Sequence, residues 1–176
     1  MNGGHDLLDE ATIREFLATT YPRLVAGVAL INGSRAAAED AVQEALARAW
    51  ERSERGERIE SLPAWVTRVA MNLSKSRLRR MRIEAKHRAD VVRVVADGDA
   101  ASDAKIDVGR ALADLPHRQR EVTVLRYYLG LDVAEIARTL ELSEGTAKTS
   151  LFRARKALAA VLGEPVEEAN DHVALG

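Results

Sequence analysis

The chain has 176 residues, with 26 Lys and Arg against 27 Asp and Glu, 47% apolar residues and only 4% aromatic residues. Because it has no Cys, a disulfide framework, a thiolate nucleophile and a Cys-ligated metal site are excluded, and a cytoplasmic location is expected. No apolar run approaches the ~18 residues of a membrane-spanning helix, so membrane insertion is not expected. The four His are scattered without metal-site or catalytic pairing, so we expect no metal, cofactor, small-molecule substrate or enzyme activity.

Helices are favoured over sheets by the abundance of Ala, Leu, Val, Arg and Glu, which predicts an all-α protein. The charges are not spread evenly. Residues 61–95 hold nine basic and two acidic residues, and residues 110–163 hold nine basic and six acidic residues, while the remaining segments are net acidic. Since exposed charges act over about 8–10 Å in physiological salt, such basic segments can attract a polyanion whatever the distant charges do. A nucleic-acid partner is therefore a hypothesis from charge alone.

The first helical pattern runs from residue 10 to residue 31, but Pro22 interrupts it. Proline is tolerated in the first turn of a helix and not in its interior. The pattern therefore predicts a short helix that ends near Thr20 and a second helix that begins around Tyr21.

A stop at Asn32-Gly33 and an N-cap at Ser34 predict a third helix over 35–53. Its apolar stripe includes Trp50, which we expect to pack inward. Its outward residues are polar: Glu39, Asp40, Gln43, Glu44 and Arg48. This polar face is either a docking surface or an ordinary solvated surface.

A fourth, long helix is predicted over 61–88, with Ser61 as its N-cap and Pro63 in its first turn. Its first half carries an apolar stripe and its second half carries the most basic stretch of the chain. The small and acidic residues that follow predict a flexible linker over 89–105. The apolar run 91–95 has no partner strand, so it is not expected to form a sheet.

Four more helical stretches are predicted over 106–114, 117–128, 132–140 and 144–162, followed by a disordered tail over 163–176. The third and fourth are separated by a tight break at 141–143, where Ser143 caps the last helix. This spacing is that of a helix-turn-helix, with the small Ala137 at the expected helix crossing. A plain helical hairpin with a solvated basic face is the simpler alternative.

The last helix has the composition of a DNA-recognition helix, in which early side chains meet base edges and cations hold phosphates. Candidate contacts to DNA are Lys148, Thr149, Ser150, Arg153 and Arg155. Phe152 is either a core residue or a contact to a thymine methyl, and the spacing of apolar residues along the helix favours the core.

Three passages of the chain, in the same order, resemble the extracytoplasmic-function (ECF) sigma factors of bacterial RNA polymerase. The passage ALADLPHRQREVTVLRYYLGLDVAEIARTLELSEGTAKTSLFRARKAL, residues 111–158, resembles the promoter-binding domain of that family. AAAEDAVQEALARAW, residues 36–50, is similar to the helix that docks on the polymerase clamp, and SLPAWVTRVAMNLSKSRLRR, residues 61–80, is similar to the promoter-melting helix. The resemblance covers about residues 16–162.

This resemblance implies a two-domain sigma factor that directs promoter-specific initiation. Residues 8–88 would bind core RNA polymerase and recognise and melt the minus-ten element, and residues 106–162 would read the minus-thirty-five element. Core RNA polymerase and promoter DNA are the implied partners, and an anti-sigma factor is implied by the family only. The runner-up is a stand-alone helix-turn-helix activator or repressor, which leaves the first two passages unexplained.

The resemblance also assigns residues. The implied minus-ten contacts are Arg68, Asn72, Lys75, Ser76, Arg79 and Arg80, with Asn72 at the position that reads a flipped base. The implied polymerase contacts are Glu39, Asp40, Gln43 and Glu44. The family usually has more cationic residues around the position of Ser150, which leaves the minus-thirty-five sequence open.

Overall fold

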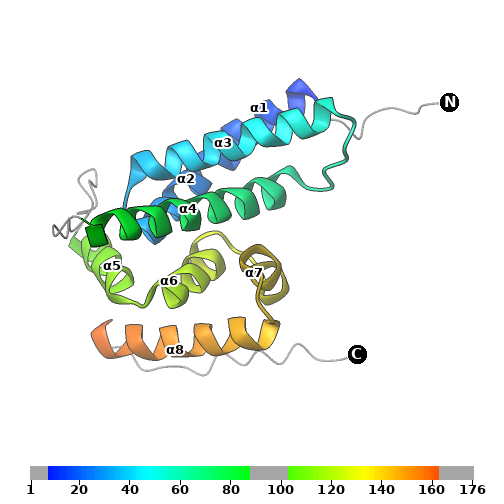
Figure 1. The fold of residues 1–176 in the computed structure, drawn as a ribbon. Coiled ribbons are helices and arrows are strands. Elements are labelled where there is room, and N and C mark those ends of the chain that lie inside the picture. Colours follow the sequence, from blue (N-terminus) through cyan, green and yellow to red (C-terminus); the bar gives the residue numbers. More distant parts are fainter. Residues whose placement is uncertain (1–7, 88–102, 163–176) are drawn as a thin grey trace, which may run out of the picture.

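The computed structural model of the protein describes residues 8–87 and 103–162. These two stretches form eight α-helices and one π-helix without a strand, which confirms the all-α prediction. The first stretch contains α1 (Glu10–Thr19), α2 (Tyr21–Asn32), α3 (Arg35–Glu54) and α4 (Leu62–His87), shown in Figure 1. The second contains α5 (Asp103–Asp114), α6 (His117–Thr123), the π-helix η1 (Val124–Tyr128), α7 (Val133–Leu140) and α8 (Glu144–Leu162).

Local sequence signals set the helix ends in the first stretch. Pro22 lies in the first turn of α2, where its missing N–H removes no helical hydrogen bond. Gly33 ends α2 with φ at 78°, a left-handed conformation that glycine adopts without a Cβ clash. The hydroxyl of Ser34 then accepts a hydrogen bond from the Ala37 amide at 3.2 Å and so caps α3. The predicted break near Thr20 and the predicted N-cap are both confirmed.

The first helical domain is built from α2, α3 and α4, which all contact one another, with α1 packed on α2. The apolar stripes of the three helices meet in a shared core. Its fully buried residues include Leu24, Val28, Ile31, Val42, Val66, Ala70 and Met71. This packing holds the polar side of α3 and the basic helix α4 in fixed relative positions.

The second helical domain is built from α5, α6, η1, α7 and α8, with α8 packed against α6 and α7. Its core residues include Val122, Leu125, Ile136, Leu140, Ala147, Leu151 and Ala154. The predicted single helix over 117–128 instead changes its hydrogen bonding after Thr123, where the chain enters η1 and the Leu129 amide donates to the Val124 carbonyl at 3.0 Å. α5 begins at Asp103, a few residues before the expected start.

The two helical domains pack directly against each other. α4 contacts α7, and α2 contacts η1, α5 and α6. Figure 1 shows α4 running along α5, α6 and α7, with α8 on the far side of these helices. At one point of this contact Gly27 of α2 faces Leu129, whose side-chain carbons would lie 3.1–3.2 Å from a Cβ at that glycine. The buried apolar residues of both domains consequently form one cluster.

Three predicted segments fall on parts of the chain that are not described. Most of the expected linker 89–105, the apolar run 91–95 and the expected tail 163–176 lie outside the described residues.

Candidate nucleic-acid interface

The helix-turn-helix is fixed by two sets of local hydrogen bonds. Asp132 and Glu135 form a capping box at the start of α7, with each side chain accepting from the other residue's amide at 2.7–2.8 Å. α7 ends at Leu140, and its C-cap Glu141 takes φ at 57°. Ser143 then caps α8 by accepting from the Thr146 amide at 3.1 Å. The predicted turn and the predicted cap are both present.

α8 buries one side against α6 and α7 and presents the opposite side to solvent. Ala147, Leu151 and Ala154 are buried, at spacings of four and three residues. Of the predicted DNA contacts, Lys148, Thr149 and Arg153 are exposed, whereas Ser150 and Arg155 are half-buried. Three of the five candidates therefore share the solvent face of α8, and the other two lie at its edges.

The structure contradicts the sequence-based prediction for the side chain of Phe152. Its side chain is 57% exposed, so the prediction that it packs in the core is wrong. The reason is that Leu151 already occupies the core position one turn after Ala147, and the next residue points about 100° further round the helix. Phe152 thus stands on the exposed face, one turn after Lys148 and one turn before Lys156.

The predicted minus-ten residues on α4 lie three and four positions apart, so Arg68, Asn72, Lys75 and Ser76 share one face of the helix. Arg68 and Ser76 are exposed, and Asn72 and Lys75 are half-buried. The side chains of Arg79 and Arg80 lie outside the described part of the structure. Both half-buried residues contact the second domain rather than solvent alone.

These contacts join α4 to two carboxylates. The Asn72 Nδ2 donates to Glu141 Oε1 at 3.3 Å, and Lys75 Nζ lies 4.0 Å from Glu121 Oε1. Glu121 of α6 is fully buried, and its other neighbours are Arg118, with Nη1 2.8 Å from Oε2, and His117, with Nε2 3.4 Å from Oε1. Burial lowers the pKa of Lys75 below its usual range, and the nearby Glu121 carboxylate opposes that shift.

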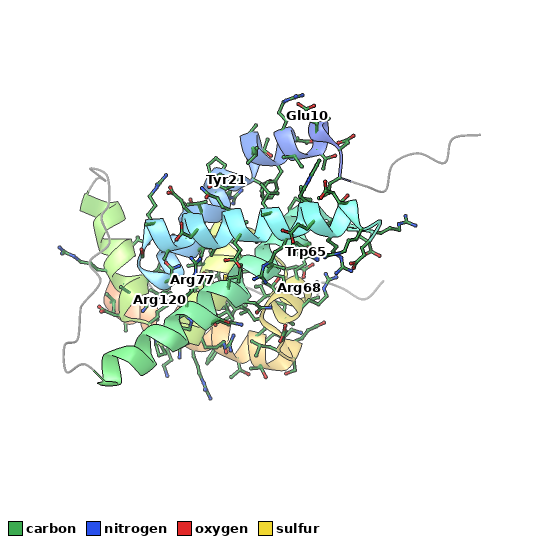
Figure 2. The ribbon with its side chains drawn as sticks, turned by 45° about the horizontal axis from the view of Figure 1, so that its top comes forward. Glu10, Tyr21, Trp65, Arg68, Arg77 and Arg120 are labelled. Carbon is green, nitrogen blue, oxygen red and sulfur yellow. The ribbon has the colours of Figure 1, made fainter. Side chains whose placement is uncertain are left out.

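The polar side of α3 holds the four predicted polymerase contacts. Asp40 and Gln43 are exposed, and Glu39 and Glu44 are half-buried. Arg77 of α4 reaches this face, with guanidinium nitrogens 3.5 Å from the Asp40 carboxylate and 3.4 Å from that of Glu44 (Figure 2). The structure therefore brings the four candidates onto one acidic surface that a basic side chain of α4 orients.

Trp50 also differs from its prediction. It is 41% exposed rather than buried. It lines an open groove of about 630 Å³ between α1 and α3, together with Leu17 and Tyr21. The apolar stripe of α3 is wider than the surface that α2 and α4 cover. Its last apolar residue, Trp50, therefore lies at the edge of α1.

Sequence reasoning missed three charged residues that shape these surfaces, namely Arg77, Glu121 and Glu141. Arg77 belongs to the basic stretch of α4 but carried no signal that separates an intramolecular ion pair from a DNA contact. Glu121 carried no local signal, because a carboxylate in a helix is normally exposed. Glu141 had one usable signal, since a helix C-terminus that precedes an N-cap usually carries Gly or Asn.

Two helical domains, the first with an acidic surface on α3 beside the basic helix α4 and the second with a helix-turn-helix that ends in the basic helix α8, are the arrangement of the sigma-70 class, which two family models match. The family model described as "Sigma-70 region 2" matches residues 17–83, and the one described as "Sigma-70, region 4" matches residues 105–158. The chain belongs to the ECF RNA polymerase sigma factors, as shown by relatives more than 30% identical over most of their length.

Two relatives show how far the sequence similarity extends along the chain. The chain is 35% identical over 126 residues to the ECF sigma factor SigM of Mycobacterium tuberculosis. The aligned residues cover 72% of this chain and 64% of that protein. It is 35% identical to SigF of Caulobacter vibrioides, which covers 86% of each chain. The chain thus spans somewhat less than two thirds of the mycobacterial relative.

Solved structures also resemble the whole fold. The sigma factor RpoE of Bartonella quintana, crystallised with the anti-sigma factor NepR, superimposes with a TM-score of 0.77 at 26% identity, over 88% of this chain and 98% of that one.

In the described residues no helix is long and apolar enough to cross a membrane, and no cluster of three or more His, Asp or Glu is arranged to hold a metal ion.

Proposed function

We propose that this protein binds core RNA polymerase and directs promoter-specific initiation, with the first domain acting at the minus-ten element and the second at the minus-thirty-five element. The domains correspond to residues 8–88 and 106–162, joined by a linker over 89–105. One observation carries the proposal. The same molecule carries an acidic surface on α3, the basic helix α4 and a helix-turn-helix that ends in the basic helix α8, in the chain order of the family whose two regions it matches.

At the minus-thirty-five element, α8 enters the major groove of duplex DNA. Its exposed Lys148 and Arg153 meet phosphates or guanine edges, and Thr149 hydrogen-bonds at the base edges, with half-buried Ser150 and Arg155 at the margins. Phe152 lies on the same face, so it contacts a thymine methyl rather than the core. A good base contact discriminates by about 1–3 kcal/mol, so this helix alone supplies only part of the specificity.

At the minus-ten element, the shared face of α4 holds the separated strand. Asn72 reads a flipped base, because its amide both donates and accepts hydrogen bonds along the Watson–Crick edge. Arg68, Lys75 and Ser76, followed by Arg79 and Arg80, track the phosphates of the strand. Flipping a base costs a few kcal/mol, which these contacts offset.

Polymerase docking uses the acidic surface of α3, formed by Glu39, Asp40, Gln43 and Glu44. Arg77 holds two of these carboxylates at fixed positions, which lowers the ordering cost on binding. Docking places both domains on one partner, so the second promoter contact becomes effectively intramolecular. The protein itself has no catalytic role in this scheme and works in the cytoplasm, with the polymerase making the RNA. An anti-sigma factor, like the one in the Bartonella complex, is a further expected partner.

DNA capture with and without polymerase tests this proposal against a stand-alone helix-turn-helix regulator. The full-length protein is mixed with fragmented genomic DNA, either alone or with core RNA polymerase, and retained fragments are sequenced. We expect enrichment of a two-part sequence only when core polymerase is present. Equal enrichment of a single duplex site by the protein alone would favour the regulator instead, because only that class needs no polymerase.

A further inference from the structure

The outer face of α8 carries an aromatic ring between cations. Phe152 is 57% exposed, and it lies one helical turn after Lys148 and one turn before Lys156. Both lysines are exposed, as is Arg153 next to the ring. Figure 1 shows α8 on the outer side of the second domain, away from α2, α3 and α4. The cations suit the phosphates of a duplex, whereas the ring suits an apolar group that lies between those phosphates.

The hydroxyl groups at the start of α8 are engaged within the helix and its cap. The Thr149 Oγ1 donates to the Gly145 carbonyl at 2.9 Å, and the hydroxyls of Ser143 and Thr146 lie 2.8 Å apart. A hydroxyl has one proton to donate and two lone pairs that accept. Because the Gly145 carbonyl takes the proton, the exposed hydroxyl of Thr149 can only accept a further hydrogen bond.

Thr149 and Phe152 are neighbours on the surface of the helix. They are three positions apart, which places their Cβ atoms about 5–6 Å from each other. In the major groove a pyrimidine presents the substituents of carbon 4 and carbon 5, which are adjacent atoms of one ring. One pyrimidine can therefore meet the hydroxyl and the aromatic ring at the same time.

The pyrimidines differ in these two substituents. Thymine has a methyl group on carbon 5 and an acceptor oxygen on carbon 4, whereas cytosine has a donor amine on carbon 4 and no methyl group. Uracil has the acceptor oxygen without the methyl group, and 5-methylcytosine has the methyl group together with the donor amine. An apolar ring beside a hydroxyl that can only accept is complementary to 5-methylcytosine. Thymine satisfies the ring alone, and cytosine satisfies the hydroxyl alone.

We propose that Thr149 and Phe152 together read 5-methylcytosine in duplex DNA, with the ring packed on the methyl group and the hydroxyl accepting from the carbon-4 amine. The inference rests on the proposed contact of α8 with the minus-thirty-five element, and it names a chemical mark that this contact recognises. Methylation of one cytosine in that element therefore strengthens promoter binding by this protein. The same promoter without the mark is bound more weakly.

A set of four bases at one position separates the methyl group from the donor. The full-length protein, with and without core polymerase, first selects sites from duplexes with a random central segment, made with either cytosine or 5-methylcytosine. Each pyrimidine of a selected site is then replaced in turn by thymine, uracil, cytosine and 5-methylcytosine, and fluorescence anisotropy measures the affinity. At one position we expect 5-methylcytosine to bind about fivefold more tightly than cytosine or thymine, because each of these loses one contact. Uracil, which loses both contacts, should bind most weakly.

Two variants assign the contacts to their side chains. Phe152→Ala should abolish the gain from the methyl group, so that 5-methylcytosine equals cytosine and thymine equals uracil. Thr149→Val keeps the branched shape and removes the acceptor, so it should abolish the preference for 5-methylcytosine over thymine and leave the gain from the methyl group intact. This variant also separates the hydroxyl from the paired purine, which differs between the two base pairs. Val161→Ala shortens another exposed apolar side chain of α8 and should match wild type, which makes it the control.

Equal affinity for cytosine and 5-methylcytosine at every position would overturn the inference, as would a gain from the methyl group that survives Phe152→Ala. Tighter binding of thymine than of 5-methylcytosine would overturn it as well, and would leave the ring as a contact to thymine. The proposed function is judged by the dependence on polymerase, because selection of the same sites without core polymerase would contradict it whatever the base preference. If no site is selected under any condition, the inference fails, and reconstituted transcription then decides the proposed function alone.

Discussion

Two adjacent residues of α8, Leu151 and Phe152, give opposite predictions for stability and DNA binding. Leu151 is 6% exposed and packs in the second core, whereas Phe152 is 57% exposed on the proposed DNA face. Truncating a buried leucine to alanine costs about 2–5 kcal/mol of folding free energy, through lost burial and a cavity. Truncating an exposed side chain changes it by about 0.5 kcal/mol or less. The larger aromatic residue should therefore be the less important one for folding.

The DNA readout reverses this order. Loss of a contact to a thymine methyl by Phe152→Ala should weaken binding to the minus-thirty-five sequence by about 1 kcal/mol, or about fivefold, which is the value of burying one methyl group. The effect should vanish when the contacted thymine is replaced by uracil, which lacks the methyl group. Urea unfolding followed by circular dichroism measures stability, and fluorescence anisotropy of polymerase-bound protein on promoter duplexes measures binding. A loss of more than about 2 kcal/mol of stability on Phe152→Ala would refute the assignment of this face.

Three further variants test the minus-ten face, the docking surface and the buried ion pairs. Asn72→Ala should reduce permanganate reactivity of minus-ten thymines about tenfold, because the flipped base loses its amide partner, while affinity for core polymerase stays the same; unchanged reactivity would contradict the assignment. The pair Gln43→Ala with Glu44→Ala should weaken binding to core polymerase by about tenfold in a titration, and wild-type affinity would argue against docking through α3. Glu121→Gln should lower the free energy of unfolding by about 1–3 kcal/mol, since Arg118 and Lys75 lose a buried counter-charge; an unchanged urea midpoint would show that the ion pairs contribute nothing.

Helix boundaries could be predicted from the sequence because single residues set them. Pro22 and Gly33 act through their own backbone conformations, and Ser34 and Ser143 act through side-chain hydrogen bonds to nearby amides, so the surrounding fold hardly alters their effect. The π-helical turn after Thr123 could not be predicted, since the apolar period continues through it without a break.

Side-chain exposure was harder to predict than helix position. Both errors concern aromatic residues, Trp50 and Phe152, which an apolar period places in the core although neighbouring helices do not cover them. The period identifies a stripe but not its width, which depends on how many helices pack against it.

The contact between the domains could not be predicted at all. Glu121 and Lys75 are far apart in the sequence, as are Gly27 and Leu129, and neither pair has a local pattern. The resemblance to sigma factors assigned Asn72 a role with DNA but carried no information on what covers it in the free protein.

The central claim is that this chain turns core RNA polymerase into a promoter-specific enzyme. Reconstituted transcription with purified full-length protein, core polymerase and genomic templates, followed by mapping of transcript starts, tests it most directly. We predict starts that share one two-part upstream sequence and that disappear when the protein is omitted. Transcripts with no shared upstream sequence, or identical starts with and without the protein, would contradict the claim.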